Sequence, residues 1–115
     1  MLINVLRSKI HRATVTSTEL HYEGSIEIDM DLIEASGMML HEKVDIYNIN
    51  NGERFSTYII EGPRGSRVIC LNGGAARKAC KGDQIIIAAY AWIPLEESEK
   101  HAPKIILLNP DNQIA

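Results

Sequence analysis

Aromatic residues are scarce in this chain of 115 residues, which contains one Phe, one Trp and four Tyr. The core of the folded domain must therefore be filled mainly by Ile, Leu and Val. Long apolar runs are absent too. The longest one, residues 85–93, covers less than half of the ~20 residues that a membrane-spanning helix needs. We therefore expect no membrane segment and a cytoplasmic location.

Metal-binding and nucleotide-binding patterns are also missing. Cys70 and Cys80 lack the close spacing of a metal site, and the four histidines show no ligand spacing. In a cytoplasmic protein the two cysteines are most simply free thiols. The sequence contains no phosphate loop, dinucleotide fingerprint or serine-hydrolase motif. We therefore expect no bound metal.

Charges of one sign do not dominate, because 12 Lys and Arg face 15 Asp and Glu, for a net charge of -3. This balance gives no general attraction to nucleic acids or anionic membranes. The basic residues are scattered, and no aromatic residues alternate with them as in a surface that binds single strands. We expect neither a nucleic acid nor a membrane as partner.

Short β-branched runs separated by turn residues make up most of the sequence, and 115 residues correspond to one domain. A short helix is expected near residues 31–34, with Asp31 as its N-cap and Gly37 just past its end, and a helical turn near 75–79. The expected strands cover residues 2–15, 25–28, 44–50, 53–61, 67–71, 84–93 and 104–108. About seven strands with one or two short helices predict a compact closed β-barrel.

The clearest local signal is Asn51-Gly52, because Asn-Gly is the preferred pair for a two-residue hairpin turn. If these two residues alone form the loop, Tyr47 lies opposite Ser56 on the partner strand. Side chains alternate between the faces of a strand. Tyr47, Arg54 and Tyr58 are therefore expected to project from the same face of the hairpin.

Four clusters could carry chemistry. Lys9 and His11 share a strand face, Ser25 follows Gly24 directly, residues 54–58 gather a cation with hydroxyls, and residues 72–75 form a small-residue loop that could bind an anion. Each is also common as an ordinary turn or solvent-facing strand. Gly65-Ser66 repeats the Gly-Ser dipeptide, so this pair alone indicates nothing. From the residues alone, the prediction ends at a small β-rich domain with an anion pocket.

Together these clusters resemble one family, the pyruvoyl-dependent aspartate 1-decarboxylases. The matching segments are SKIHR at 8–12, YEGSIEID at 22–29, NNGERFSTY at 50–58 and LNGGAAR at 71–77. They follow in order and at the family's mutual spacing, and the similarity runs from residue 2 to about residue 108. Gly65-Ser66 lacks this context. The resemblance therefore places the family's reactive Gly-Ser pair at Gly24 and Ser25.

The resemblance implies a six- to seven-stranded double-psi β-barrel that assembles as a homotetramer with active sites between neighbouring subunits. It implies a precursor that cuts itself between Gly24 and Ser25, giving a β chain of residues 1–24 and an α chain of residues 25–115. Glycine would permit a strained turn at the cut, and serine would provide the carbon skeleton of the new group. Some relatives need a maturation protein for this step.

The cofactor implied by the resemblance is a pyruvoyl group made from Ser25, with no metal and no PLP. It would form a Schiff base with L-aspartate, whose decarboxylation gives β-alanine for pantothenate biosynthesis. Tyr58 corresponds to the family's proton donor, and Arg54 and Lys9 are the cations suited to the two substrate carboxylates. Further substrate contacts are expected from Thr57, Gly73, Gly74 and Ala75. The remaining pocket residues are expected to be His11, Tyr22, Tyr47 and Asn72.

Three positions need comment. Strand alternation places the side chains of Thr57 and Tyr58 on opposite faces of the strand. Either a β-bulge is present, therefore, or Thr57 acts through its backbone. Tyr47 stands where several relatives carry Trp, and Gly74 stands where Ala is common. Neither of the differences at Tyr47 and Gly74 touches the cut site, the proton donor or the cation, so we expect activity to survive.

Two other functions remain open from the residues. The first is a non-catalytic β-barrel that serves binding or assembly. The second is a hydrolase with Ser25 as nucleophile and His11 as base, although no acidic partner for the histidine is evident. Both predict one intact chain. Only the decarboxylase predicts two chains from one gene.

Overall fold

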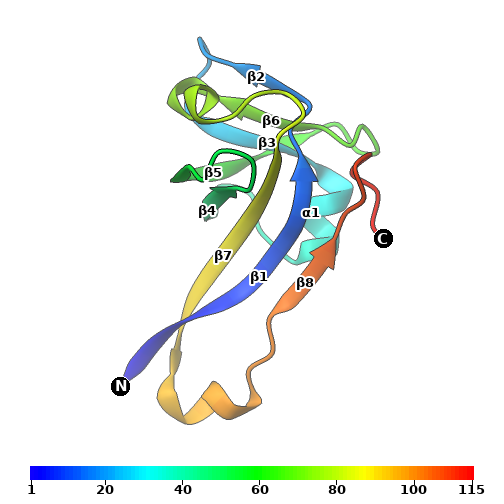
Figure 1. Cartoon of the computed structure of the whole chain (residues 1–115). Coiled ribbons are helices and arrows are strands. Elements are labelled where there is room, and N and C mark those ends of the chain that lie inside the picture. The colour runs from blue at the N-terminus through cyan, green and yellow to red at the C-terminus, as the bar shows by residue number, and fades with distance from the viewer.

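Strands are the main secondary structure of the computed structural model, which describes all of residues 1–115 (Figure 1). The eight strands are β1 Leu2–Thr14, β2 Ser17–Glu19, β3 Ser25–Asp29, β4 Lys43–Asn48, β5 Arg54–Gly62, β6 Ile69–Asn72, β7 Gln84–Pro94 and β8 Lys104–Leu107. Helix α1 covers Met30–Ser36, and two 3₁₀ helices cover Gly73–Lys78 (η1) and Leu95–Lys100 (η2). No helix is long and apolar enough to cross a membrane.

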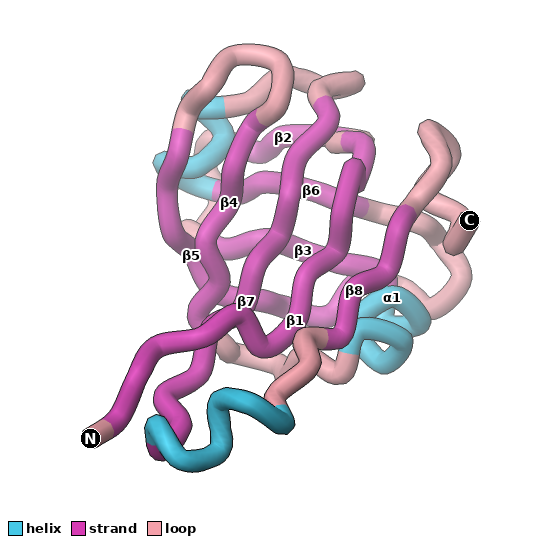
Figure 2. Tube along the Cα trace, turned by 60° about the horizontal axis from the view of Figure 1, so that its bottom comes forward, coloured by secondary structure: helices cyan, strands magenta, loops and turns pink.

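The strands form one mixed sheet in the order β2-β6-β3-β5-β4-β7-β1-β8. β1 and β2 lie near opposite ends of this order, yet they are consecutive in the chain, so the sheet has to curl back on itself. Thr16, between them, donates its backbone N–H to the carbonyl of Ile69 at 2.8 Å. Figure 2 shows the result, with β4, β7, β1 and β8 in front of β2, β6 and β3. The expected β-barrel is confirmed.

The barrel encloses a cluster of 19 buried residues in which isoleucine dominates. The fully buried isoleucines are Ile10, Ile26, Ile28, Ile33, Ile46, Ile59, Ile69, Ile85 and Ile87. Phe55 is the one aromatic residue packed against this cluster. The aliphatic core expected from the composition is therefore present, and the Tyr and Trp side chains lie outside it.

The turn between β4 and β5 is longer than predicted. Tyr47 pairs with Arg54 instead of Ser56, so the predicted register is wrong by two residues. The cause is Asn48, which is buried and whose Oδ1 accepts from the backbone N–H of Asn50 at 2.9 Å, closing a four-residue loop. An even shift leaves each side chain on its predicted face. Tyr47, Arg54 and Tyr58 accordingly share one face, as expected.

The N-cap of α1 is Asp29, and the prediction of Asp31 is wrong. An Asp29 oxygen accepts from the backbone N–H of Asp31 at 2.9 Å. The same buried carboxylate accepts from Gly65 at 2.9 Å and from Arg67 at 2.7 Å, which ties the loop before β6 to the helix start. Gly37 ends the helix in a left-handed conformation with φ 76°, as expected. The sheet has eight strands where six or seven were expected, because the three-residue β2 pairs at its edge.

Candidate active site

Ser25 begins β3, between β6 and β5. It pairs with Asn72 across the antiparallel β3–β6 ladder. In the parallel β3–β5 ladder Ile26 pairs with Ile59. Ser25 directly precedes Ile26, and Tyr58 directly precedes Ile59. Ile26 and Ile59 are fully buried in the core. Because side chains alternate, Asn72, Ser25 and Tyr58 form a row on the outer face of the barrel.

Hydrogen bonds within the chain hold the Ser25 hydroxyl. Its Oγ accepts from Asn72 Nδ2 at 3.0 Å and donates to the carbonyl oxygen of Glu23 at 3.3 Å. Ser25 is only 3% exposed and Asn72 only 4%. The hydroxyl is therefore fixed in orientation beside the peptide bond that joins Gly24 to Ser25.

Two hollows flank this peptide bond. One has a volume of about 420 Å³ and is lined by His21, Tyr22, Glu23, Ser25, Tyr58, Ile60 and Asn72. The other has a volume of about 530 Å³ and is lined by Gly24, Phe55, Ser56, Thr57, Tyr58, Gly74, Ala75 and Lys78. Each is large enough for a small ligand. Tyr58 lines both hollows, so its side chain borders the one next to Ser25 and the one next to Gly24.

The small loop after β6 packs directly on the segment before Ser25. Gly73 has φ +66°, and a Cβ on it would lie 2.7 Å from Gly24 N and 2.8 Å from Tyr22 O. Only glycine fits there. Gly24 itself is outside the left-handed region, and a Cβ on it would meet nothing within 4 Å. Gly24 therefore has neither a left-handed backbone nor a close contact at its Cβ position, and the steric demand for glycine falls on Gly73.

Thr57 lies in a regular part of β5. It pairs with Val44 in an unbroken β4–β5 register, so the β-bulge considered above does not occur. Thr57 lines the second hollow together with Gly24, Gly74 and Ala75. Three of the expected substrate contacts, Thr57, Gly74 and Ala75, thus meet at one hollow.

A second group of site residues lies further along the same outer face. The guanidinium of Arg54 stacks over the ring of Tyr47, with Cζ 4.6 Å from the ring centroid. The Tyr47 hydroxyl is 2.7 Å from the hydroxyl of Tyr90. Burial, together with the hydrogen bond to Tyr90, raises the pKa of Tyr47 to about 12. Tyr47 is therefore a neutral support for the Arg54 cation at neutral pH.

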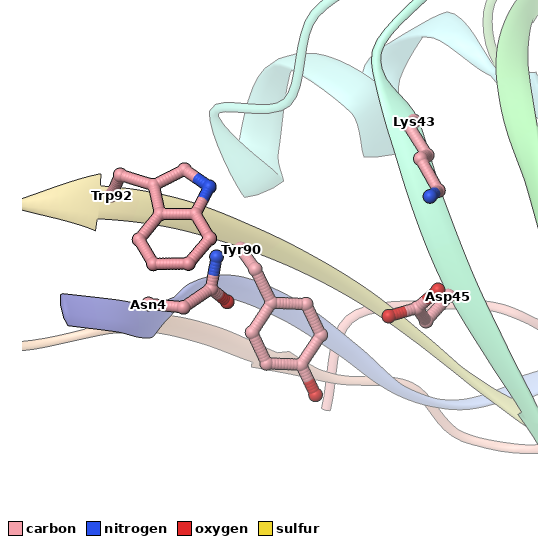
Figure 3. A pocket seen from close by; sticks show the side chains of 5 residues that line it. All are labelled: Asn4, Lys43, Asp45, Tyr90 and Trp92. Atoms are coloured by element: carbon pink, nitrogen blue, oxygen red, sulfur yellow. The ribbon is translucent and has the colours of Figure 1, made fainter.

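Tyr90 also borders a third hollow, of about 350 Å³, with Asn4, Lys43, Asp45 and Trp92 (Figure 3). These side chains come from β1, β4 and β7 and surround an open depression. Trp92 is 66% exposed. Aromatic side chains therefore extend this face well beyond the row that contains Ser25.

Lys9 and His11 lie on β1, away from Ser25. Lys9 pairs with Ala88 on β7, and β4 separates β7 from β5. Three strand spacings put β1 ~14 Å from β5. Arg54, four residues before Tyr58 on β5, lies ~13 Å from it along the strand. One chain thus brings together the residues around the Gly24–Ser25 bond, and it leaves the two cations at a distance.

His11 is half-buried. Burial lowers the pKa of its imidazole, and the positive charges of Lys9 and Arg12 lower it further. Its Nδ1 is buried without a hydrogen-bond partner. His11 therefore favours the neutral form in the folded chain.

The aspartate decarboxylase family model matches residues 1–115. This chain belongs to the aspartate decarboxylase family. The aspartate 1-decarboxylase of Syntrophus aciditrophicus is 58% identical over 110 residues, which cover 96% of this chain and 95% of the relative. Those of Sulfurimonas denitrificans and Maricaulis maris are 58% and 54% identical over 114 residues, each covering 99% of this chain and 94% of the relative.

Several residues that line the hollows beside Gly24 and Ser25, or contact their lining, were not predicted from the sequence. Ile60 lines the hollow next to Ser25, and its position two residues after Tyr58 on one strand could have indicated this. Lys78 lines the second hollow, and its ammonium also pairs with Glu53 at 3.1 Å. Nothing in the motif spacing indicated Lys78. Cys70 was noted only as a free thiol, although it contacts Asn72.

Proposed function

We propose that this chain is an aspartate 1-decarboxylase, which converts L-aspartate to β-alanine and CO2 and so supplies pantothenate biosynthesis. The observation that carries the proposal is the placement of Ser25. A buried serine, hydrogen-bonded at Oγ, directly follows a glycine, and these two residues border two hollows that share Tyr58. The full-length similarity to named aspartate 1-decarboxylases supports the same substrate.

The chain is expected to create its own reactive group. Ser25 Oγ adds to the carbonyl carbon of Gly24, the C–N bond between the two residues breaks, and the hydroxyl proton passes to the freed amine, which leaves an ester. Removal of the Ser25 Cα proton then expels the Gly24 carboxylate and leaves a dehydroalanine. Tautomerisation and addition of one water molecule release ammonia and leave a pyruvoyl group at the N-terminus of the chain of residues 25–115.

The residues present fit a pyruvoyl group at this position. Ser25 provides its carbon atoms, and the hollow of about 420 Å³ beside it gives room for water and substrate. The group, once formed, supplies a carbonyl that reacts with the substrate amine and accepts the electrons released as CO2 leaves. The Asn72 amide still offers a hydrogen bond toward residue 25. Tyr58 delivers a proton to the carbon that has lost CO2. A phenol keeps its proton at neutral pH and can donate it.

The N-terminal piece is expected to stay bound after the cut. β1 pairs along most of its length with β7 and also with β8, and both of these strands belong to residues 25–115. Asn112 adds two hydrogen bonds, because its side chain accepts from the backbone N–H of Thr14 at 2.7 Å and donates to the Thr14 carbonyl at 2.9 Å. Cleavage between Gly24 and Ser25 therefore removes one covalent link and leaves these contacts in place.

A complete substrate site is expected to need more than one chain. Aspartate carries two carboxylates, and the cations suited to them, Arg54 and Lys9, lie far from Ser25 within one chain. The outer face also exposes large apolar side chains, among them Leu2 at 59% and Trp92 at 66%. Such a face is typical of a subunit interface. We place Arg54 and Lys9 of one subunit next to Ser25 of a neighbour in a homotetramer.

Mass spectrometry of the intact, denatured protein tests this function, together with an assay for β-alanine. We expect one chain of residues 1–24 and one of residues 25–115 that begins with a pyruvoyl group. Ser25→Ala should remain a single chain and form no β-alanine. A maturation protein is supplied by repeating the incubation with cell extract. One intact chain without β-alanine after both incubations would favour the non-catalytic barrel, and β-alanine formed by Ser25→Ala would exclude the pyruvoyl mechanism.

A further inference from the structure

The hydrogen bonds at Ser25 continue past Asn72 to a residue that the proposed function leaves unused. Cys70 lies two residues before Asn72 on β6, so their side chains share a strand face. The Cys70 thiol donates to Asn72 Oδ1 at 3.3 Å, while Asn72 Nδ2 donates to Ser25 Oγ at 3.0 Å. Cys70, Asn72 and Ser25 are each at most 4% exposed. The three side chains form a buried line that ends at the cut site.

The amide of an asparagine can turn by 180°, which exchanges its donor and its acceptor. Ser25 Oγ can accept from one orientation or donate to the other, so Ser25 by itself does not select between them. The Cys70 thiol favours the orientation seen in the structure, in which its S–H donates to Oδ1, over the turned one, in which its sulfur would have to accept from the NH2 group. With Oδ1 bonded to Cys70, the NH2 group of Asn72 faces Ser25.

The state of the Cys70 thiol agrees with this role. Burial raises the pKa of the thiol, and the carboxylates of Glu27 and Glu19 raise it further, while a hydrogen bond from Ser17 acts in the opposite direction. The sulfur therefore keeps its proton at neutral pH and can serve as a donor. No exposed or reactive thiolate is involved.

We propose that Cys70 is a positioning residue for self-cleavage, which orients the Asn72 amide so that it donates to Ser25 Oγ. The proposal rests on the cleavage between Gly24 and Ser25 set out above. With the amide turned, Ser25 would give its proton to Asn72 instead of the Glu23 carbonyl. The lone pairs of Oγ would then be oriented differently toward the Gly24 carbonyl carbon, and the attack would slow.

Two substitutions separate this role from simple packing. Cys70→Val fills the site with an apolar side chain but removes the donor, and Cys70→Ser keeps a donor but is smaller and more polar. If packing matters, valine is the better replacement in a buried site. If the hydrogen bond matters, serine is the better one. Cys80→Ser is the matched control, since Cys80 is the exposed free cysteine.

The measurement is the rate at which newly synthesised, pulse-labelled precursor converts into the two chains, followed by intact mass. Thermal unfolding of the same variants, each combined with Ser25→Ala, gives their stabilities. We expect Cys70→Val to slow conversion about five- to tenfold, as for the loss of one orienting hydrogen bond, while remaining at least as stable as Cys70→Ser. Cys70→Ser and Cys80→Ser should convert within about twofold of the parent.

Either of two results would overturn the role of Cys70. Conversion of Cys70→Val at the parent rate would show that the thiol does not orient Asn72. Equal slowing by Cys70→Ser and Cys70→Val would indicate packing instead of a hydrogen bond. A parent chain that never converts would refute the proposed self-cleavage itself, and this outcome is distinct from both.

Discussion

Ser25 and Arg54 lie on the same outer face of the barrel in contrasting surroundings. Ser25 is 3% exposed, and its hydroxyl is bonded on two sides by groups of its own chain. Arg54 is exposed at the start of β5, where the ring of Tyr47 supports its guanidinium. The hydrogen bonds of Ser25 are complete within a single chain, whereas Arg54 presents its charge on the outer surface.

The difference indicates that the two tasks proposed for the site, self-cleavage and substrate binding, have different structural requirements. Self-cleavage joins atoms of adjacent residues, so every group that orients them can come from the same chain. Binding of a dianionic substrate needs cations at a distance set by the substrate, and these can be added by a neighbour. Each region can be tested by itself, and so can the connection between them.

The largest effect is expected from Gly73→Ala, in the region that one chain completes. A Cβ would lie 2.7 Å from Gly24 N and 2.8 Å from Gly24 Cα, in a backbone with φ +66°. We expect cleavage to be lost and the free energy of unfolding to fall by about 3 kcal/mol, measured by intact mass and urea unfolding. Gly74→Ala is the control, because nothing lies within 4 Å of its Cβ position. Normal cleavage of Gly73→Ala would contradict the close approach.

Tyr58→Phe should separate cleavage from decarboxylation. Tyr58 lines both hollows, but it makes none of the hydrogen bonds that hold Ser25 Oγ. We expect normal conversion into two chains, with formation of β-alanine slowed at least ~100-fold, as for the removal of a general acid. Intact mass and a β-alanine assay on the same sample measure both steps. Full decarboxylation by Tyr58→Phe would exclude it as the proton donor.

Arg54→Ala tests whether the two regions meet between subunits. It should cleave normally and lose nearly all decarboxylation, and Ser25→Ala should lack both. If a site takes Ser25 from one subunit and Arg54 from the next, random mixed tetramers should recover up to about a quarter of the parent activity. The two variants are therefore unfolded together, refolded and assayed. No recovery in verified mixed tetramers would place both residues of a site in the same subunit.

The sequence could predict the fold wherever the signal was periodic. Alternation predicted the strands and the shared face of Tyr47, Arg54 and Tyr58. The β4–β5 register was wrong because a buried side chain, Asn48, sets the loop length, and turn propensity does not contain such a contact. Strand β2 was missed because three residues are too few to show a period.

The candidate site was predicted mainly through the family resemblance. The motifs predicted a site around Ser25 and a need for glycine at Gly24, and the structure adds a close contact that requires glycine at Gly73. That contact joins residues far apart in the sequence, so it could not be deduced from either motif alone. The line from Cys70 to Asn72 depends on side-chain rotamers within β6, which a strand pattern does not specify.

The smallest predicted effect concerns His11, on β1 in the outward-facing region. Burial lowers its pKa below the ordinary 6.5, and Lys9 and Arg12 add to the shift. As the pH falls through 6.5, the unfolded chain takes up this proton first, so stability is complete above that pH and declines below it until the folded chain is protonated too. In a Ser25→Ala background, His11→Asn should therefore flatten the decline in unfolding free energy between pH 7 and pH 5, as measured by urea titrations across that range. An unchanged slope would mean that His11 has the same pKa in the folded and the unfolded chain. The outward-facing region would then leave this imidazole as open to water as it leaves Arg54.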